Sequence, residues 1–282
     1  MPQVLQLSAG THNFMTCVIL KREGVKCWGI NTDGELGLGD TSTRGDELGE
    51  MGNALPAVDL GTGRSAVRLA VGYAFACALL DDGSVKCWGG NWNGQLGQGD
   101  VDDRGDNSGE MGDNLPSIDL GTGRTALSIS AAFYHTCALL DDGSVKCWGR
   151  NDYAQLGLGD VTDRGDNSGE MGDNLPSVDL GTGRTVAIVS AAMYHTCAVL
   201  DDGSVKCWGR NHYGQLGLGD TIGRGYISGE MGDALEAVEV VGETSLCEVI
   251  AVCEWCADQV ARLMEERVGR VWKVGAWWWR RG

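Results

Sequence analysis

The cysteines of this chain recur with a period of 60 residues, and this regularity constrains the fold more than any other feature of the sequence. Sliding the sequence against itself by 60 residues aligns four cysteine pairs without a gap: Cys17 and Cys27, Cys77 and Cys87, Cys137 and Cys147, and Cys197 and Cys207. Each unit also contains VKCWG, an Asn four residues after its Cys, a Leu-Gly pair and GEMG. A period of this length, with several short strands per unit, is typical of propeller blades rather than helical solenoids.

Each unit is expected to contain four short strands. In the second unit they fall at residues 66–71, 75–80, 84–88 and 115–120. The middle two form a hairpin, because Asp81-Asp82-Gly83 is a three-residue turn in which Gly can adopt the left-handed conformation. Pairing outward from this turn places Cys77 opposite Cys87 and Trp88 opposite Ala76. We therefore expect an all-β fold, a β-propeller built from four tandem 60-residue blade repeats.

The repeat ends near residue 242. The expected organisation is a repeat region at residues 1–242 and a non-repeat tail at residues 243–282. Within the tail, Leu246 to Val268 has apolar residues at helical spacing and predicts an amphipathic helix. Four units leave three arrangements open: a closed ring, an open arc that is an incomplete ring, or part of a longer propeller.

Composition and charge restrict the partners. The chain has 45 Gly and 10 Trp among 282 residues, which suits tight turns and aromatic-rich strands. A net charge of −17 disfavours nucleic acid, since phosphate binding needs a local excess of Lys and Arg, and favours partners with a basic surface. No stretch approaches the ~18 apolar residues of a membrane-spanning helix, and the N-terminal MPQVLQLSAGTHNF does not resemble a secretion signal.

The segment HTCALLDDGSVKCWGRN, followed by QLGLGD, resembles the blade of the regulator of chromosome condensation family. The superfamily also includes secreted beta-lactamase inhibitory propellers and a plant UV-B photoreceptor. The resemblance covers residues 4–242 and implies a propeller, with seven blades in typical members. It implies no single function, because the fold serves nucleotide exchange on a small GTPase, light sensing, enzyme inhibition and ubiquitin-ligase scaffolding.

The four cysteine pairs are compatible with disulfides, metal ligands or buried thiols. Residues directly opposite each other in a non-hydrogen-bonded antiparallel pair have Cα atoms about 4.5 Å apart, within the usual disulfide range of about 4.4 to 6.8 Å. We expect disulfides, since chance would have to place both partners opposite each other in all four units. Disulfides would favour a secreted or extracellular protein, and free thiols a cytoplasmic one.

Every unit carries a long loop rich in carboxylates. We select the acids of the second and third loops as candidate binding residues: Asp103, Asp106, Glu110, Asp163, Asp166 and Glu170. Dense carboxylates can hold calcium, but their spacing here is not that of an EF-hand. The main interpretation is a solvated loop that Arg104 or Arg164 ties to nearby carboxylates. A calcium-dependent extracellular binding module is an alternative.

No catalytic constellation stands out, because the candidate acids recur in every repeat whereas catalytic residues are usually singular. His135 and His195 occupy the position of Phe75 in the second unit, so we expect structural hydrogen bonds rather than a metal. Cys253 and Cys256 form a lone CxxC, which is weak support for a metal site. We expect no enzyme, cofactor or metal, but a non-catalytic scaffold whose propeller loops bind a protein. Guanine-nucleotide exchange on a small GTPase is the alternative that the family suggests.

Overall fold

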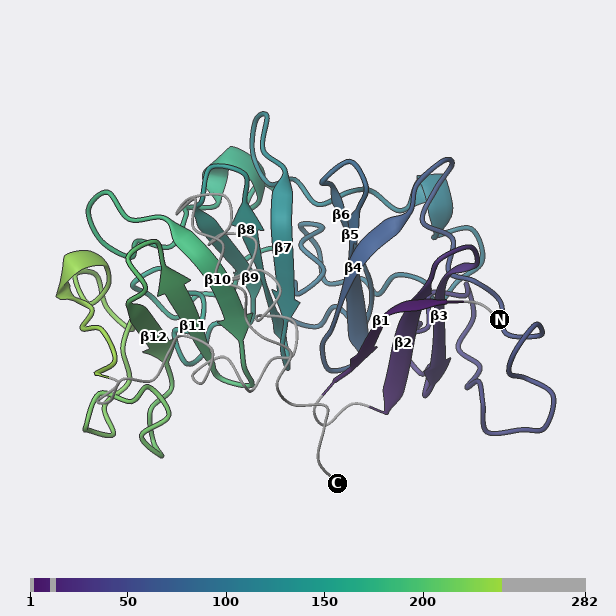
Figure 1. Ribbon diagram of the computed structural model, residues 1–282, viewed down its shortest axis with the longest axis horizontal. Coiled ribbons are helices and arrows are strands. Elements are labelled where there is room, and N and C mark those ends of the chain that lie inside the picture. The colour runs from purple at the N-terminus through teal and green to yellow at the C-terminus, as the bar shows by residue number, and fades with distance from the viewer. Residues whose placement is uncertain (1–2, 11–13, 240–282) are drawn as a thin grey trace, which may run out of the picture. The chain divides into compact units, whose positions relative to one another are not determined.

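Short antiparallel strands are gathered into four sheets of three strands, one sheet for each repeat, in the described part of the chain (Figure 1). The computed structural model describes residues 3–10 and 14–239. The predicted tail at residues 243–282, with its helix and its CxxC pair, lies outside the described residues. The predicted all-β propeller architecture with four tandem blades is confirmed.

The three strands follow each other in the same order in every unit, and a short 3₁₀ helix comes after the third strand in the second, third and fourth units. They are β1 (Val4–Ala9), β2 (Met15–Leu20), β3 (Gly24–Gly29), β4 (Ala66–Val71), β5 (Phe75–Leu80), β6 (Val85–Gly89), η1 (Gly112–Asn114), β7 (Ala126–Ala131), β8 (His135–Leu140), β9 (Val145–Gly149), η2 (Gly172–Asn174), β10 (Val186–Ala191), β11 (His195–Leu200), β12 (Val205–Gly209) and η3 (Gly232–Ala234).

The hairpin predicted in the middle of each unit is confirmed, together with its register. In the second sheet Cys77 lies opposite Cys87 and Ala76 opposite Trp88. Gly83 has φ +81°, and its N–H donates to the Leu80 carbonyl at 3.0 Å, so a glycine closes the turn in the left-handed conformation. The hairpin register is therefore a local property of the sequence.

The fourth strand predicted for each unit is wrong, because residues 115–120 are not part of the sheet. One hydrogen bond joins this segment to β6, from the Ile118 N–H to the Val85 carbonyl at 2.8 Å. Pro116 has no N–H to donate. The next unit binds two carbonyls of the segment: the Gly172 N–H donates to the Asp119 carbonyl, and Lys146 Nζ donates to the Leu120 carbonyl at 3.0 Å. The segment therefore joins consecutive units instead of widening its own sheet.

The apolar core lies between consecutive sheets. The Trp88 indole is completely buried and donates to the Glu35 carbonyl of the first unit at 3.1 Å. Trp148 and Trp208 make the same bond to the carbonyls of Gln95 and Gln155. Each core cluster accordingly draws side chains from two neighbouring units. A unit of this protein buries its apolar face only when a neighbour covers it.

The four cysteine pairs face each other across the hairpins and are disulfide-bonded in the structure. Their Cα atoms are 4.1 Å apart in every unit, slightly closer than the ~4.5 Å of directly opposite residues in a non-hydrogen-bonded antiparallel pair. Each bond therefore joins the two strands of a single hairpin, and none links different units.

Candidate protein-binding surface

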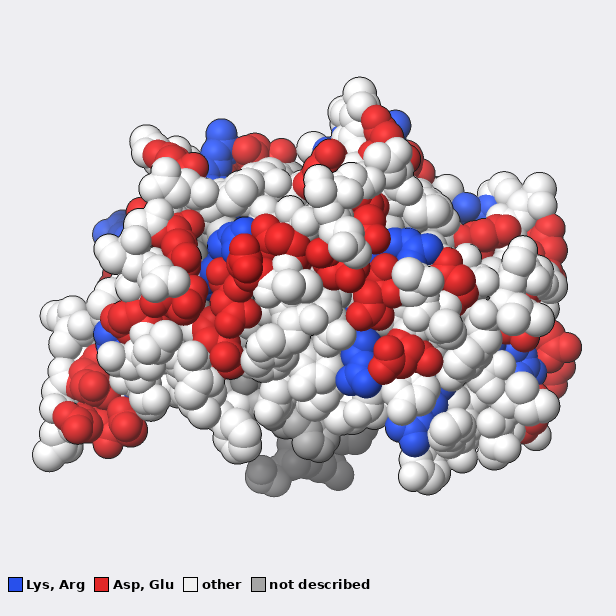
Figure 2. Space-filling model, turned by 180° about the vertical axis from the view of Figure 1, so that it is seen from behind, with Lys and Arg blue, Asp and Glu red and all other residues white. Residues whose placement is uncertain are grey.

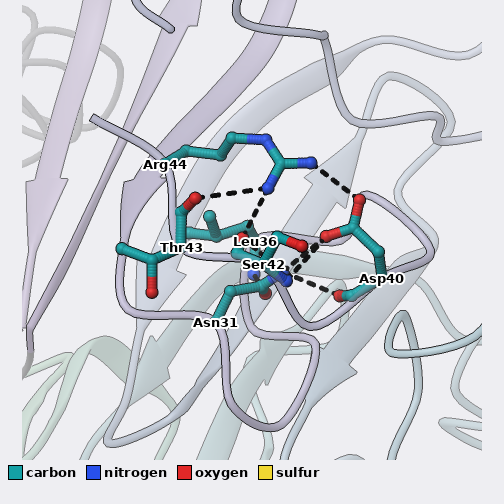
Figure 3. A network of polar contacts seen from close by, with 6 residues as sticks. All are labelled: Asn31, Leu36, Asp40, Ser42, Thr43 and Arg44. Atoms are coloured by element: carbon teal, nitrogen blue, oxygen red, sulfur yellow. Dashed lines mark hydrogen bonds and ion pairs between the residues drawn. The ribbon is translucent and has the colours of Figure 1, made fainter. Parts of the chain in front are cut away.

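A buried asparagine organises the loop that follows the third strand of each sheet. In the first unit the Asn31 side-chain amide donates to the Asp40 carbonyl at 2.7 Å and the Ser42 carbonyl at 3.1 Å, and its Oδ1 accepts the Leu36 N–H at 2.9 Å (Figure 3). The equivalent residues Asn91, Asn151 and Asn211 repeat the bonds to the corresponding Leu and Asp. One side chain thus closes each loop at its base.

An arginine ties each loop to an aspartate four residues earlier. Arg44 Nη2 lies 2.7 Å from Asp40 Oδ2 (Figure 3), and the Arg104–Asp100 pair measures 2.6 Å. The third and fourth loops contain the same ion pair. The predicted role of Arg104 and Arg164 is therefore confirmed. Because these pairs are partly exposed, each contributes at most about 1 kcal/mol and mainly fixes the loop conformation.

Two of the three predicted binding acids of the second loop, Asp103 and Glu110, accept hydrogen bonds from the backbone of their own unit, and Asp106 accepts one from the Asn107 side chain. Glu110 Oε2 accepts the Gly105 N–H at 2.8 Å and the Asn107 N–H at 3.1 Å. Asp103 Oδ1 accepts the Asn91 N–H at 2.8 Å. All of these carboxylates are only partly exposed. They therefore help to build the loop, whatever else they bind.

The third loop repeats this arrangement and adds a contact between units. Glu170 Oε2 accepts the Gly165 N–H at 2.9 Å, and Asp163 Oδ1 accepts the Asn151 N–H at 2.7 Å. Asp163 Oδ2 also accepts a bond of 3.1 Å from the Asn93 side chain of the second unit. Asp163 therefore connects its own loop to the preceding unit.

Burial changes the acidity of these groups. It raises the pKa of Asp103 and Asp163, although the amide donors of Asn91 and Asn151 act in the opposite direction. Burial also raises the pKa of Asp106 and Asp166, and each has one buried carboxylate oxygen without a hydrogen-bond partner. The neighbouring Glu110 behaves differently, because amide donors outweigh its burial and lower its pKa.

Aromatic side chains of three units form a continuous cluster at the end of the sheets where these loops begin. We call it the aromatic surface, and it consists of Tyr73, Trp92, Phe133, Tyr134, Tyr153, Tyr194 and Tyr213. Its members come from the turn between the first and second strands and from the segment after the third strand. Backbone bonds hold these segments together, since the Arg150 N–H donates to the Tyr134 carbonyl at 2.8 Å.

The rings of the aromatic surface contact each other across unit boundaries. The ring centroids of Tyr73 and Phe133 are 4.5 Å apart, and those of Phe133 and Tyr134 are 4.4 Å apart. Phe133 then lies 6.1 Å from Tyr194, which lies 4.9 Å from Tyr153. These separations are those of favourable aromatic pairs. The second, third and fourth units therefore share one aromatic cluster.

Two arginines lie over these rings. The Arg150 guanidinium carbon is 5.5 Å from the centre of the Tyr134 ring, and that of Arg210 is 5.0 Å from Tyr153 and 5.2 Å from Tyr194. Such distances allow cation–π attraction. At the outer side of the cluster, Trp92 is 45% exposed and Tyr213 is 86% exposed. The cluster is therefore accessible to another molecule.

The aromatic surface is not evident from the repeat pattern, because its residues occupy positions that vary between repeats. Position 92 is Trp, whereas the third and fourth units have Asp152 and His212 there. The one available signal was that aromatic residues gather at the variable positions next to the turns that recur in every repeat. By contrast, the predicted binding acids are mostly repeated residues, and they serve the repeated loop.

His135 makes the structural hydrogen bond that was expected of it. His135 is fully buried, and its Nε2 lies 2.9 Å from Thr196 Oγ1 of the fourth unit. Burial and the nearby His195 lower the pKa of His135 to about 3. Among the described residues, no group of three or more His, Cys, Asp or Glu is placed to hold a metal ion. None of the described helices has the length and apolar character needed to cross a bilayer.

Comparison with known proteins identifies the repeat. The model of the regulator of chromosome condensation (RCC1) repeat matches residues 66–95, 127–155 and 186–215, and a second RCC1 repeat model matches residues 142–199. The ultraviolet-B receptor UVR8 of Arabidopsis thaliana is 28% identical over 223 residues, which are 78% of this chain and 44% of the receptor. The human E3 ubiquitin-protein ligase HERC2 is 31% identical over 69% of this chain and 4% of the ligase.

Solved structures show the same fold at low sequence identity. Human WBSCR16 is 19% identical, with a TM-score of 0.62 over 86% of this chain and 55% of that one. Prp20p of Saccharomyces cerevisiae, described with its binding properties to Gsp1p and histones, is 18% identical, with a TM-score of 0.59 over 94% of this chain and 60% of that one. The chain thus spans at most about 60% of the length of these relatives.

Proposed function

Because this chain belongs to the RCC1 repeat family, we propose that it is a non-catalytic scaffold whose propeller loops bind a protein partner. The observation that carries this proposal is the aromatic surface with Arg150 and Arg210. Tyr, Trp and Arg are the side chains that most often dominate the energy of protein interfaces. Here they lie on turns that rigid hairpins hold in place, which limits the entropy lost on binding.

The carboxylates around the aromatic surface favour a partner with a basic patch. Asp103 accepts the N–H of Asn91, the residue before Trp92. Asp163 accepts a hydrogen bond from the side chain of Asn93, the residue after Trp92. The other predicted acids, Asp106, Glu110, Asp166 and Glu170, add negative charge along the same loops. Acidic side chains are spread over the face shown in Figure 2, with isolated Lys and Arg between them. With a net charge of −17, the chain attracts basic partners over a long range.

The proposal is tested by affinity capture with quantitative mass spectrometry, using matched variants. The surface variant combines Trp92→Ala with Tyr213→Ala, and the control variant is Leu127→Ala, an exposed apolar residue of β7. A true partner binds the wild type and the control but not the surface variant. With purified partner, we expect stoichiometric binding and a dissociation constant raised about tenfold or more by the double substitution. Equal capture by all three proteins would contradict the assignment of this surface.

Two further measurements separate the scaffold from its alternative and test the role of charge. The double variant Asp103→Asn, Asp163→Asn should bind more weakly, and its affinity should depend less on salt. Unchanged affinity and salt response would show that these acids serve their loops alone.

An exchange factor would instead accelerate nucleotide release from a small GTPase at catalytic concentrations. Such acceleration would overturn the non-catalytic proposal.

A further inference from the structure

The contact between consecutive units is made by two different faces. One unit contributes a receiving face, with the carbonyl of Glu35 and the surrounding glycines, and the next contributes an inserting face, with Trp88. A Cβ added at Gly37 would lie 2.8 Å from the Trp88 indole nitrogen, and one at Gly34 would lie 2.2 Å from the Asp106 backbone nitrogen. The next unit therefore lies directly against both glycines, although the third boundary accommodates Ala154 at the position of Gly34.

The same glycines recur in the fourth unit, where no other unit among the described residues lies against them. At Gly214, the equivalent of Gly34, the nearest atom to an added Cβ is the Asp220 carbonyl oxygen of its own unit at 3.9 Å. An added Cβ at Gly217, the equivalent of Gly37, meets only Val238 of its own unit, and at Gly219 it meets nothing within 4 Å. Gln215 is partly exposed, whereas the equivalent Gln95 is completely buried. Among the described residues, the receiving face of the fourth unit is therefore uncovered.

The first unit presents an uncovered inserting face. Trp28 is partly exposed, whereas its three counterparts are completely buried, and its indole N–H has no acceptor among the described residues. Gly45 is exposed, although the equivalent Gly105 is buried. Leu48 is fully exposed at the position of Ser108, whose Cα would lie 3.3 Å from a Cβ at Gly39. The face thus offers an indole and a leucine without a neighbour.

We propose that the receiving face of the fourth unit binds the inserting face of the first unit of a second copy of this chain. The occupant is specified by three contacts within the protein, in which the same two faces already meet. In the docked copy Trp28 donates to the Gln215 carbonyl, and Leu48 lies against Gly219. Because the two faces differ, the contact is head-to-tail and repeats the geometry of the internal boundaries.

Each face can be blocked by one substitution. Gly214→Asn blocks the receiving face, since Asn tolerates a positive φ and its side chain, longer than that of Ala154 at the same position of the third boundary, would meet the loop at residues 45–46 of the docked copy. Leu48→Lys blocks the inserting face by placing an ammonium group where the apolar contact forms. Gly183→Asn is the matched control, because Gly183 has φ +71° against +73° at Gly214, and an added Cβ there meets nothing within 4 Å.

Sedimentation velocity of the full chain over a wide concentration range, together with thermal melts of each variant, tests the proposal. We expect the wild type and Gly183→Asn to self-associate. Each blocking variant alone should have a dissociation constant for self-association that is about tenfold higher or more. An equimolar mixture of the two blocking variants should associate again, because each supplies the face that the other has lost. A monomeric wild type would overturn the proposal. So would self-association that Gly214→Asn leaves unchanged, or a mixture that fails to recover while both variants melt like the control.

Discussion

Trp148 in the third unit and Trp28 in the first occupy the same position of the same VKCWG segment, yet their surroundings differ. Trp148 is completely buried and donates to the Gln95 carbonyl at 3.0 Å. Trp28 has the same kind of partner across its hairpin, Thr16, but it is partly exposed, because no neighbouring unit among the described residues lies against it. The difference shows that the repeated sequence encodes the contact between units as much as the hairpin itself. Stability in such an array comes largely from its internal boundaries.

The largest expected effect is a difference between these two tryptophans. Trp148→Ala removes a buried indole and leaves a cavity between two sheets, which should cost about 3–5 kcal/mol of unfolding free energy. Trp28→Ala should cost roughly half as much or less, because the indole already contacts solvent. Urea denaturation at a protein concentration too low for self-association measures both. Equal losses of unfolding free energy would contradict the view that the indole stabilises the boundary between units rather than the hairpin.

The same contrast explains which parts of the fold were predictable. The hairpin register follows from a local turn, so Gly83 and the opposite cysteines sufficed to place it. The fourth strand failed, since the carbonyls of Asp119 and Leu120 bind groups of the next unit. The sequence pattern of one unit does not show that the next unit will bind these two carbonyls.

The candidate site was predictable only in part, for a related reason. Repetition drew attention to Asp106 and Glu110, and repeated residues mostly maintain the repeated loop. The aromatic surface arises where variable residues of three units come together, such as Phe133 between Tyr73 and Tyr194. Predicting it requires the order and spacing of the sheets as well as the sequence.

The disulfides should not distinguish inner from outer units. Cys137–Cys147 and Cys17–Cys27 close loops of the same length, each with a sequence separation of 10, and act mainly on the unfolded chain. Replacing either pair by Ala should cost about 2–3 kcal/mol in both units. Denaturation of the two variants measures the cost, and non-reducing peptide mapping checks the pairing. Recovery of all eight cysteines as free thiols from an oxidising compartment would contradict the pairing and favour a cytoplasmic protein.

The last expected effect, the smallest near neutral pH, concerns one buried histidine, and it distinguishes the third unit from the second. His135 occupies the position of Phe75, and both side chains are completely buried. The pKa of His135 is about 3 in the folded protein, against 6.5 for an ordinary histidine. Between these values the unfolded chain binds more protons than the folded one. The stability contributed by the neutral His135 side chain is therefore complete above pH 6.5 and is lost as the pH falls toward 3.

His135→Phe should remove this dependence. In that pH window the wild type should lose about 1.4 kcal/mol more per pH unit than the variant, since one proton is taken up on unfolding. Thr196 loses its contact with the imidazole but still donates to the Gln155 carbonyl, so the substitution leaves that hydroxyl with a partner. His195→Phe is the matched comparison in the outer unit, where His195 is less completely buried and burial also lowers its pKa. Its effect on the pH slope should be smaller. Denaturation curves at several pH values measure both variants, and an equal change in slope would show that the fourth unit shields its histidine as well as an inner unit does.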